Sequence, residues 1–297
     1  MLTSITTERL LLSPLAMGDG KFILELVNTD GWLRFIGNRN INSEADAIAY
    51  IQTLIENPNI NYWVVRLKGA DTAIGIITFI KREVLAYHDI GFALLPAYEH
   101  KGYAYEAAGA VLLDIVHSAK HTHVSSITNV NNGAAIKLLK KLGFEFQNLI
   151  NVENENVAVY ETSANKLCIT EITNRFFSAF TNKGNEQPKL DLLKDICIPE
   201  AMITNNNRST ADIFNLSSFI DKRSKILTDG TLVEFEEKEI FEETKIVENI
   251  ATRFSEYEKK GFVFRQRFHL KGYKLFQFVK IKQSWKICSI LWIDNEN

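Results

Sequence analysis

The chain has 297 residues, of which 46% are hydrophobic and 24% charged, and its formal net charge is -2 at pH 7. This composition is that of a globular protein, and the length suits two domains of ordinary size. No stretch concentrates Lys and Arg on one face, which disfavours binding to nucleic acid. No apolar run approaches the ~20 residues that span a bilayer, and the first residues lack the pattern of a secretion signal. The sequence therefore predicts a cytoplasmic protein without a membrane partner, in which three dispersed cysteines are free thiols: Cys168, Cys197 and Cys288.

The first half of the sequence alternates strand and helix patterns. Ser43 precedes apolar residues at helical spacing, which predicts a helix from Ser43 to about Glu56 with Ser43 as N-cap. Gly143 marks the end of a short helix. In chain order the expected elements are strand 9–15, helices 22–27 and 43–56, strands 62–67, 73–80 and 89–95, helix 107–116, strand 124–129, helix 132–142, and strands 144–149 and 157–161. This order predicts an α/β fold with a mixed, mostly antiparallel sheet and flanking helices.

The apolar pattern breaks at residues 162–166, which predicts a linker between two domains, 1–163 and 167–297. The second domain begins with helical patterns and continues with alternating strands, an order typical of α+β folds. Its expected elements are helices 169–180 and 216–227, and strands 231–241, 245–257, 262–270, 273–281 and 285–293. The acidic run at 234–243 alternates with apolar residues and predicts a solvated sheet edge or face.

Residues 90–107 are the most informative for chemistry, because a strand ends there, a short loop follows and an Ala-rich helix begins. Gly102 and Ala104 present little side-chain bulk, so a ligand can approach the backbone closely. The unpaired N–H groups and the dipole at the start of the helix favour an anion such as a diphosphate. The loop matches neither the P-loop pattern GxxxxGK[ST] nor the Rossmann pattern GxGxxG.

This stretch resembles motif A of the GNAT acetyltransferases, in particular the branch that acetylates ribosomal-protein N-termini. The resemblance is collinear from Thr7 to Phe144, and its segments are residues 7–12, 73–75, 91–96, 101–106 and 132–144. It implies a GNAT fold that uses acetyl-CoA as cosubstrate, needs no metal and acetylates a primary amine, either a protein N-terminus or a small molecule.

The resemblance also implies roles for individual residues. The main chain of Phe92, Ala93 and Leu94 would bind the pantetheine arm as an added strand. Asn132 would hydrogen-bond the cofactor near its cysteamine end. The diphosphate would be bound by backbone N–H groups of the loop, at His100, Lys101, Gly102, Tyr103, Ala104 and Tyr105.

The chain departs from the family pattern in two respects. Glu99 and His100 stand where relatives often carry Gln, Arg or Gly, and a carboxylate near a diphosphate weakens binding unless it points outward. More distant GNAT branches use a tyrosine as acid for the leaving thiolate, and Leu139 occupies that position here. The branch that this chain resembles often lacks that tyrosine too.

Amide formation needs a base, because an alkylammonium with a pKa near ~10 must lose a proton before it attacks a thioester. Backbone N–H groups of the splayed strand would stabilise the oxyanion, and transfer would be direct, in a ternary complex without an acyl-enzyme. Asp89 is the first candidate for the base, directly or through a water, with His88 and Glu83 as alternatives. An equally weighted alternative makes Asp89 a solvated residue at the end of a strand.

Other clusters have plain structural explanations. His117, His121 and His123 lack the further ligands of a zinc site, and we interpret them as polar residues near a helix end. Trp32 and Phe35 lie in the region where the acceptor cleft of the family is expected, and they are interpreted as candidate walls of that cleft.

Residues 167–297 resemble the NTF2-like or SnoaL-like superfamily, in which a curved sheet forms a cone around helices. The resemblance lies in residues 219–223, 230–235, 250–251, 255–257, 272–279, 284–287 and 292–294. Members are enzymes, ligand binders or dimerisation modules, so the fold assigns no reaction. Arg223, Arg265 and His269 are either polar groups in an apolar cone, suited to a small acidic ligand, or surface residues.

The large apolar residues of the last strands predict a homodimer that buries part of this sheet: Phe276, Phe278, Trp285 and Trp292. For the chain as a whole, the sequence favours an acetyl-CoA-dependent N-acetyltransferase. Two alternatives are a CoA-binding sensor without turnover and a protein whose second domain binds a small hydrophobic ligand.

Overall fold

The computed structural model describes residues 3–152, 155–207 and 210–295, and the chain divides into two compact units, Met1–Leu167 and Cys168–Asn297. Unit 1 comprises, in order, β1 Ile5–Thr6, β2 Leu10–Pro14, the short 3₁₀ helix η1 Met17–Asp19, α1 Gly20–Val27, α2 Asp30–Phe35, α3 Glu44–Glu56, β3 Ile60–Leu67, β4 Ala73–Ile80, β5 Asp89–Leu94, η2 Pro96–Tyr98, α4 Tyr103–His117, β6 His123–Asn129, α5 Gly133–Lys141, β7 Glu145–Val152 and β8 Glu155–Ser163. Among the described residues, no helix is both long enough and apolar enough to cross a membrane.

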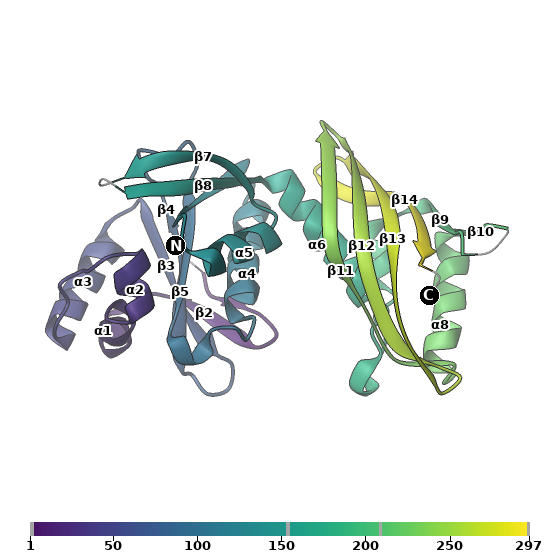
Figure 1. The fold of residues 1–297 in the computed structure, drawn as a ribbon, viewed down its shortest axis with the longest axis horizontal. Coiled ribbons are helices and arrows are strands. Elements are labelled where there is room, and N and C mark those ends of the chain that lie inside the picture. Colours follow the sequence, from purple (N-terminus) through teal and green to yellow (C-terminus); the bar gives the residue numbers. More distant parts are fainter. Residues whose placement is uncertain (1–2, 153–154, 208–209, 296–297) are drawn as a thin grey trace. The chain divides into compact units, whose positions relative to one another are not determined.

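The sheet of unit 1 has eight strands in the order β1-β2-β3-β4-β5-β6-β8-β7. Neighbouring strands are antiparallel except β5 and β6, which are parallel. Helices α1, α2 and α3 lie on one side of this sheet, and α4 and α5 lie on the other (Figure 1). Both faces of the central strands are therefore covered, which explains why β4 is buried along nearly its whole length.

Local sequence signals set the helix ends in unit 1. The Ser43 side chain accepts a hydrogen bond from the Asp46 N–H, and the Asp46 carboxylate accepts one from the Ser43 N–H, which together cap α3. Gly143 follows α5 with a φ of +85°, as expected for a glycine after a helix C-terminus. The apolar face of α3 is narrower than predicted, because Ala47, Ile51 and Leu54 are buried while Ile48 and Ile55 are exposed.

No irregular linker follows unit 1, contrary to the sequence prediction for residues 162–166. Strand β8 runs to Ser163, and α6 Ala164–Ser178 begins at the next residue. Thr162 is buried in the strand, and the Ser163 hydroxyl accepts a hydrogen bond from the Lys166 N–H in the first turn of the helix. The polar composition of this segment therefore reflects a helix start and not a flexible connection.

Unit 2 continues with η3 Lys183–Asn185, α7 Leu192–Ile196, β9 Cys197–Asn205, β10 Asp212–Asn215, α8 Leu216–Thr228, β11 Leu232–Val247, β12 Ile250–Val263, β13 Gln266–Ile281 and β14 Ser284–Asp294. Its sheet has six strands in the order β10-β9-β14-β13-β12-β11, and only β9 and β14 are parallel. Phe176 of α6 and Phe219 of α8 belong to one apolar core with Phe276, Phe278 and Ile290 of the sheet. The strands curve along their length (Figure 1).

The strands of unit 2 are longer than the sequence predicted. The expected breaks near residues 242–244 and 271–272 do not exist, because β11 and β13 pass through them. Gly272 is needed for close packing and not for a turn, since a Cβ there would lie 2.4 Å from the Ile293 carbonyl oxygen and 2.7 Å from the Tyr257 hydroxyl. The turns lie instead at Glu248, Phe264 and Lys282, each with a positive φ.

The inner face of this sheet carries paired charges. Arg253 is 1% exposed and its guanidinium donates to both carboxylate oxygens of Glu239, at 2.9 and 2.6 Å. Lys274 and Glu237 form a second buried pair at 2.7 Å. β11 is an edge strand, as expected from its acidic run, but Glu237 and Glu239 point inward to these cations and are not solvated.

The apolar residues chosen for a dimer interface face the wrong way for that role. Phe276, Phe278, Trp285 and Trp292 are 1–6% exposed and belong to the core of unit 2. Because side chains alternate along a strand, the solvent-facing apolar residues are their neighbours: Tyr273, Leu275, Leu291 and Ile293, which are 37–49% exposed.

Candidate functional site

Strands β5 and β6 separate within the sheet of unit 1. They pair only at Asp89 and Ser125, where the Ser125 N–H donates to the His88 carbonyl oxygen at 2.9 Å. Beyond this point the Ser126 hydroxyl donates to the Ile90 carbonyl oxygen at 2.8 Å, so a side chain replaces a ladder bond. Toward β6, the main chain of residues 91–94 consequently has no strand partner among the described residues. An open main-chain edge of this kind can bind an extended ligand.

Asp89 lies at the point where the two strands separate. One carboxylate oxygen accepts the Ile127 N–H at 3.0 Å, and the other accepts the Arg82 Nε at 2.7 Å. The residue is 3% exposed, so the alternative of a solvated strand-end residue is wrong. Burial raises the pKa of the Asp89 carboxyl above its ordinary value, although Arg82 and the Ile127 N–H oppose this shift. Its role as general base stays a prediction.

The two alternative bases differ in their surroundings. The His88 ring stacks on Phe79 with ring centroids 4.9 Å apart and contacts the His121 ring at 4.6 Å. Burial lowers the pKa of His88, and the neighbouring His121 and Lys81 lower it further. His88 is therefore predominantly neutral at pH 7 and able to accept a proton. Glu83 is exposed in the turn between β4 and β5.

The loop after β5 leads to the start of α4. His100 and Gly102 have φ angles of +58° and +81°, and Gly102 is the N-cap of this 15-residue helix. Gly102 has no side chain, so no N-cap side chain accepts a hydrogen bond from the N–H groups in the first turn of α4. Glu99 is about half exposed and lies 3.9 Å from His100, so its charge is screened by solvent and does not point into a closed site.

Arg9 and Glu106 fix this loop to the start of β2. The Arg9 Nε donates to the Glu106 carboxylate at 2.6 Å, and the Arg9 N–H and the Thr7 hydroxyl donate to its other oxygen at 2.9 and 2.6 Å. Arg9 also donates to the Lys101 carbonyl oxygen at 3.1 Å and stacks over the Tyr103 ring at 4.7 Å. Thr7, Arg9 and Glu106 lie in segments that resemble the GNAT pattern, but nothing in the sequence indicates that they meet.

Asn132 caps α5 at the end of the separating strand β6. Its side-chain oxygen accepts the Ala135 N–H at 3.1 Å, which leaves its NH₂ group as the donor for a ligand. Leu139 of the same helix is fully buried in the core, so the described structure provides no acid at that position.

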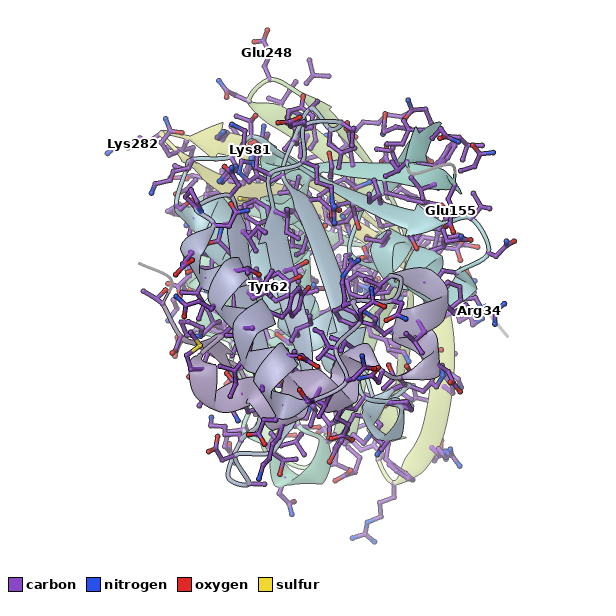
Figure 2. All side chains as sticks on the ribbon, turned by 90° about the vertical axis from the view of Figure 1, so that its left-hand side faces the viewer. Arg34, Tyr62, Lys81, Glu155, Glu248 and Lys282 are labelled. Carbon is purple, nitrogen blue, oxygen red and sulfur yellow. The ribbon has the colours of Figure 1, made fainter. Side chains whose placement is uncertain are left out.

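The aromatic residues proposed as acceptor walls divide into two cases. Trp32 is 4% exposed and belongs to the core between the sheet and α1–α3, so its assignment to a cleft wall is wrong. Phe35 is partly exposed, and the guanidinium of Arg34, at the periphery in Figure 2, lies over its ring at 5.0 Å. Of these two residues, only Phe35 therefore has exposed surface that an acceptor could contact.

Two of the three histidines with metal-like spacing contact aromatic rings. His121 packs edge-on against Phe79, and His123 stacks on Tyr87 with ring centroids 4.7 Å apart. Within residues 3–152, 155–207 and 210–295, no group of three or more His, Cys, Asp or Glu side chains is arranged to hold a metal ion.

Comparison with known proteins identifies the fold that carries this site. Residues 9–145 match the family model described as the acetyltransferase (GNAT) domain. Unit 1 contains a GNAT acetyltransferase domain. The uncharacterized N-acetyltransferase YnaD of Bacillus subtilis (strain 168) is 28% identical over 139 residues, which cover 47% of this chain and 81% of YnaD. YoaA of the same organism, also named an uncharacterized N-acetyltransferase, is 24% identical over 156 residues, or 50% and 87% of the two chains.

Solved structures also resemble the GNAT domain. A GNAT-family acetyltransferase from Bacillus anthracis has a TM-score of 0.49 and 22% identity, covering 55% of this chain and 99% of its own. RimL, described as the ribosomal L7/L12 alpha-N-protein acetyltransferase in complex with coenzyme A, has a TM-score of 0.49 and 13% identity, covering 54% and 98%. The predicted GNAT fold of the first half is confirmed by the family match.

The hydrogen bonds of Thr7 and Arg9 to the Glu106 carboxylate predict a pH-dependent stability. Burial raises the pKa of Glu106, but the hydrogen bonds from Thr7 and Arg9 outweigh it and hold the pKa below its ordinary 4.5. The charged form therefore stabilises the fold above pH 4.5, and this contribution is lost as the pH falls through the folded-state value. Glu106→Gln should lower the free energy of unfolding by about 1–2 kcal/mol at pH 7, measured by urea denaturation.

The difference between wild type and Glu106→Gln should shrink as the pH is lowered from 7 to 3. Glu25→Gln is the control, because Glu25 is exposed on α1. A loss of equal size at all pH values would show that the carboxylate charge does not stabilise the loop.

Proposed function

We propose that the GNAT domain moves the acetyl group of acetyl-CoA to a primary amine. The observation that carries this proposal is the continuity of two features: the open main-chain edge of β5 at residues 91–94 runs directly into the loop whose Gly102 begins α4 without a side-chain cap. The first feature suits an extended arm with amide groups, and the second suits a diphosphate. A cofactor with a diphosphate joined to a pantetheine arm has both parts in this order.

Each predicted cofactor residue contacts a particular part of acetyl-CoA in this proposal. The main chain of Phe92, Ala93 and Leu94 binds the pantetheine amides, and the NH₂ group of Asn132 donates to the same arm. The diphosphate is bound at the loop and first turn of α4, by N–H groups from His100, Lys101, Gly102, Tyr103, Ala104 and Tyr105. The exposed positions of His100 and Lys101 keep their side chains out of the way of the ligand.

The proposed reaction is a direct transfer. The amine loses a proton to the base, its nitrogen forms a bond to the thioester carbon, and the carbon–sulfur bond breaks to release CoA as the thiolate or thiol. Asp89 is the proposed base, because it lies where the strands part and its raised pKa brings it closer to the operating pH. N–H groups of the open edge of β5 stabilise the oxyanion. A protein N-terminus and a small primary amine are the two proposed acceptor classes.

Gly102→Asp should abolish acetyl-CoA binding, because it places bulk and a negative charge at the diphosphate. Gly102→Ala is the matched control: with φ at +81° both variants bear the cost of a left-handed side chain, about 1 kcal/mol, but only Asp adds charge. The measurement is the increase in Tm on adding acetyl-CoA, which should be lost in Gly102→Asp and largely retained in Gly102→Ala. An equal increase in wild type and Gly102→Asp would exclude this loop as the diphosphate site.

Asp89→Asn should lower kcat/KM by about 10²-fold or more while acetyl-CoA affinity is retained. The acidic limb of the pH–rate profile should disappear, because Asn does not titrate in this range. Arg82→Gln, which removes the ion pair but keeps the carboxylate, separates positioning from proton transfer and should keep an acidic limb. If Asp89→Asn reduces stability but retains kcat and the acidic limb, Asp89 only holds β5 and β6 in place, and His88 becomes the candidate base.

A CoA-binding sensor without turnover is the competing function, and the buried Leu139 at the position of the acid favours it. Release of free thiol from acetyl-CoA in the presence of an amine panel separates the two functions. The cytoplasmic location and the NTF2-like character of unit 2 stay predictions.

The homodimer also stays a prediction, with a different interface from the one first expected. The apolar row of Tyr273, Leu275, Leu291 and Ile293 is continuous across β13 and β14, since Tyr273 pairs with Ile293 and Leu275 pairs with Leu291. A second copy presents the same row, so two copies can cover each other.

Leu275→Glu should convert the dimer to a monomer in light scattering. Val247→Glu is the control, because Val247 lies at an exposed strand end, and it should not change the dimer. A wild-type monomer at micromolar concentration would exclude the dimer.

A further inference from the structure

Unit 2 contains a cavity of about 470 Å³ between its helices and the inner face of its sheet. Its size is within the ~300–1,000 Å³ typical of small-molecule sites. Most of the wall is apolar and comes from α6, α8, β11, β13 and β14: Phe176, Phe219, Phe235, Phe268, Leu270 and Trp292. The β12–β13 turn forms the rim, where Phe264 is 75% exposed.

The charged groups around this cavity are not balanced. Lys274 and Glu237 pair at 2.7 Å, and Lys259 pairs with Asp294 at 2.6 Å, so each lysine has its own carboxylate. Arg223 of α8 also lines the cavity, yet within the described residues it makes no hydrogen bond and no ion pair. Away from the exposed rim, where Arg267 is a fourth cation, Arg223 is therefore the one lining cation among the described residues without a carboxylate in direct contact.

Arg223 is held in position by aromatic rings. Its guanidinium lies over the Phe219 ring at 5.4 Å and over the Trp292 ring at 5.7 Å. Stacking of this kind orients the guanidinium plane but leaves its N–H groups free to donate. Burial lowers the pKa of Arg223, and Glu237 and Asp294 oppose that shift. An arginine side chain stays charged in proteins, so a fixed cation with unused donors faces an apolar cavity.

We propose that unit 2 binds a small amphipathic monocarboxylate, with its carboxylate on Arg223 and its apolar body against the aromatic wall. A planar carboxylate matches the forked guanidinium and takes two of its N–H groups at once. Inside the cavity one negative charge compensates Arg223, whereas the second charge of a dianion such as a phosphate ester would lie close to Glu237. Arg267, exposed at the rim, adds a further positive charge that attracts the ligand from solution.

This site is independent of the acetyl transfer proposed for unit 1. Of the ligands that the sequence suggested, the proposal favours the small acidic one at Arg223 over the small hydrophobic one, because a wholly apolar ligand would leave the Arg223 donors unpaired in the cavity. A partly buried charge without a partner is costly, so the charged head and not only the apolar body determines affinity.

The test compares decanoate with decanol by isothermal titration calorimetry on the full chain, since these ligands differ only in the headgroup. Decanoate should bind at least about tenfold more tightly than decanol to wild type. In Arg223→Met the affinity for decanoate should fall to that for decanol, while decanol binding changes by less than about threefold. Arg265→Met is the control, because Arg265 is exposed in the neighbouring turn and does not line the cavity; it should keep the wild-type preference.

Arg223→Lys provides a second variant in case Arg223→Met does not fold. It keeps the charge but loses the forked donor geometry, and its preference for decanoate should be intermediate. Naphthalene-1-acetate is a second probe with a rigid aromatic body. The proposal is overturned if wild type binds decanoate and decanol equally, if Arg223→Met or Arg223→Lys keeps the full preference, or if neither carboxylate binds at millimolar concentration.

Discussion

The separation of β5 from β6 is the constraint on which the architecture of unit 1 depends. Parallel strands ordinarily hold each other through evenly spaced main-chain hydrogen bonds. Here the Asp89 carboxylate accepts the Ile127 N–H and the Ser126 hydroxyl donates to the Ile90 carbonyl oxygen, so side chains make the bonds that strand pairing would make. An open edge therefore forms inside a sheet and not at its border. The buried carboxylate that creates this edge needs Arg82 beside it, because burial without a partner would favour its neutral form.

Unit 1 could be predicted from sequence where the signal is local. Ser43 caps α3 through a hydrogen bond to a residue three positions later, and Gly143 follows α5 with the left-handed φ expected after a helix C-terminus. The hydrogen bonds at the candidate site that escaped prediction join distant residues: Arg9 and Glu106 are 97 positions apart, and Asp89 and Ile127 are 38 apart. Propensity and periodicity describe neighbours in the chain, so these pairs become visible only when the strand order is known. The core position of Trp32 was missed for the same reason.

Unit 2 shows why alternation alone does not tell which face of a strand is buried. In β13 Lys274, Phe276 and Phe278 point inward, while Tyr273 and Leu275 point outward. Both faces of β13 carry large apolar side chains, and the inner face also carries a lysine. The hydrophobic pattern therefore does not decide which face is buried. The strand ends were also hidden, because the turns at Glu248, Phe264 and Lys282 use positive φ angles without glycine or proline.

The pairing of buried cations in unit 2 shows why Arg223, which has no carboxylate in contact within the described part of the chain, is unusual. Removing charges from water is costly, and unit 2 compensates Arg253 with Glu239 and Lys274 with Glu237, in each case by direct contact. Against this background of matched pairs, a stacked guanidinium without a carboxylate cannot be explained as part of the structural charge network. The two proposed anion sites thus differ in their chemistry: in the site proposed for unit 1 the donors are main-chain N–H groups, whose position depends on backbone geometry at Gly102. In the site proposed for unit 2 the donors belong to one side chain, so a single substitution that leaves the backbone unchanged should remove affinity for an anion.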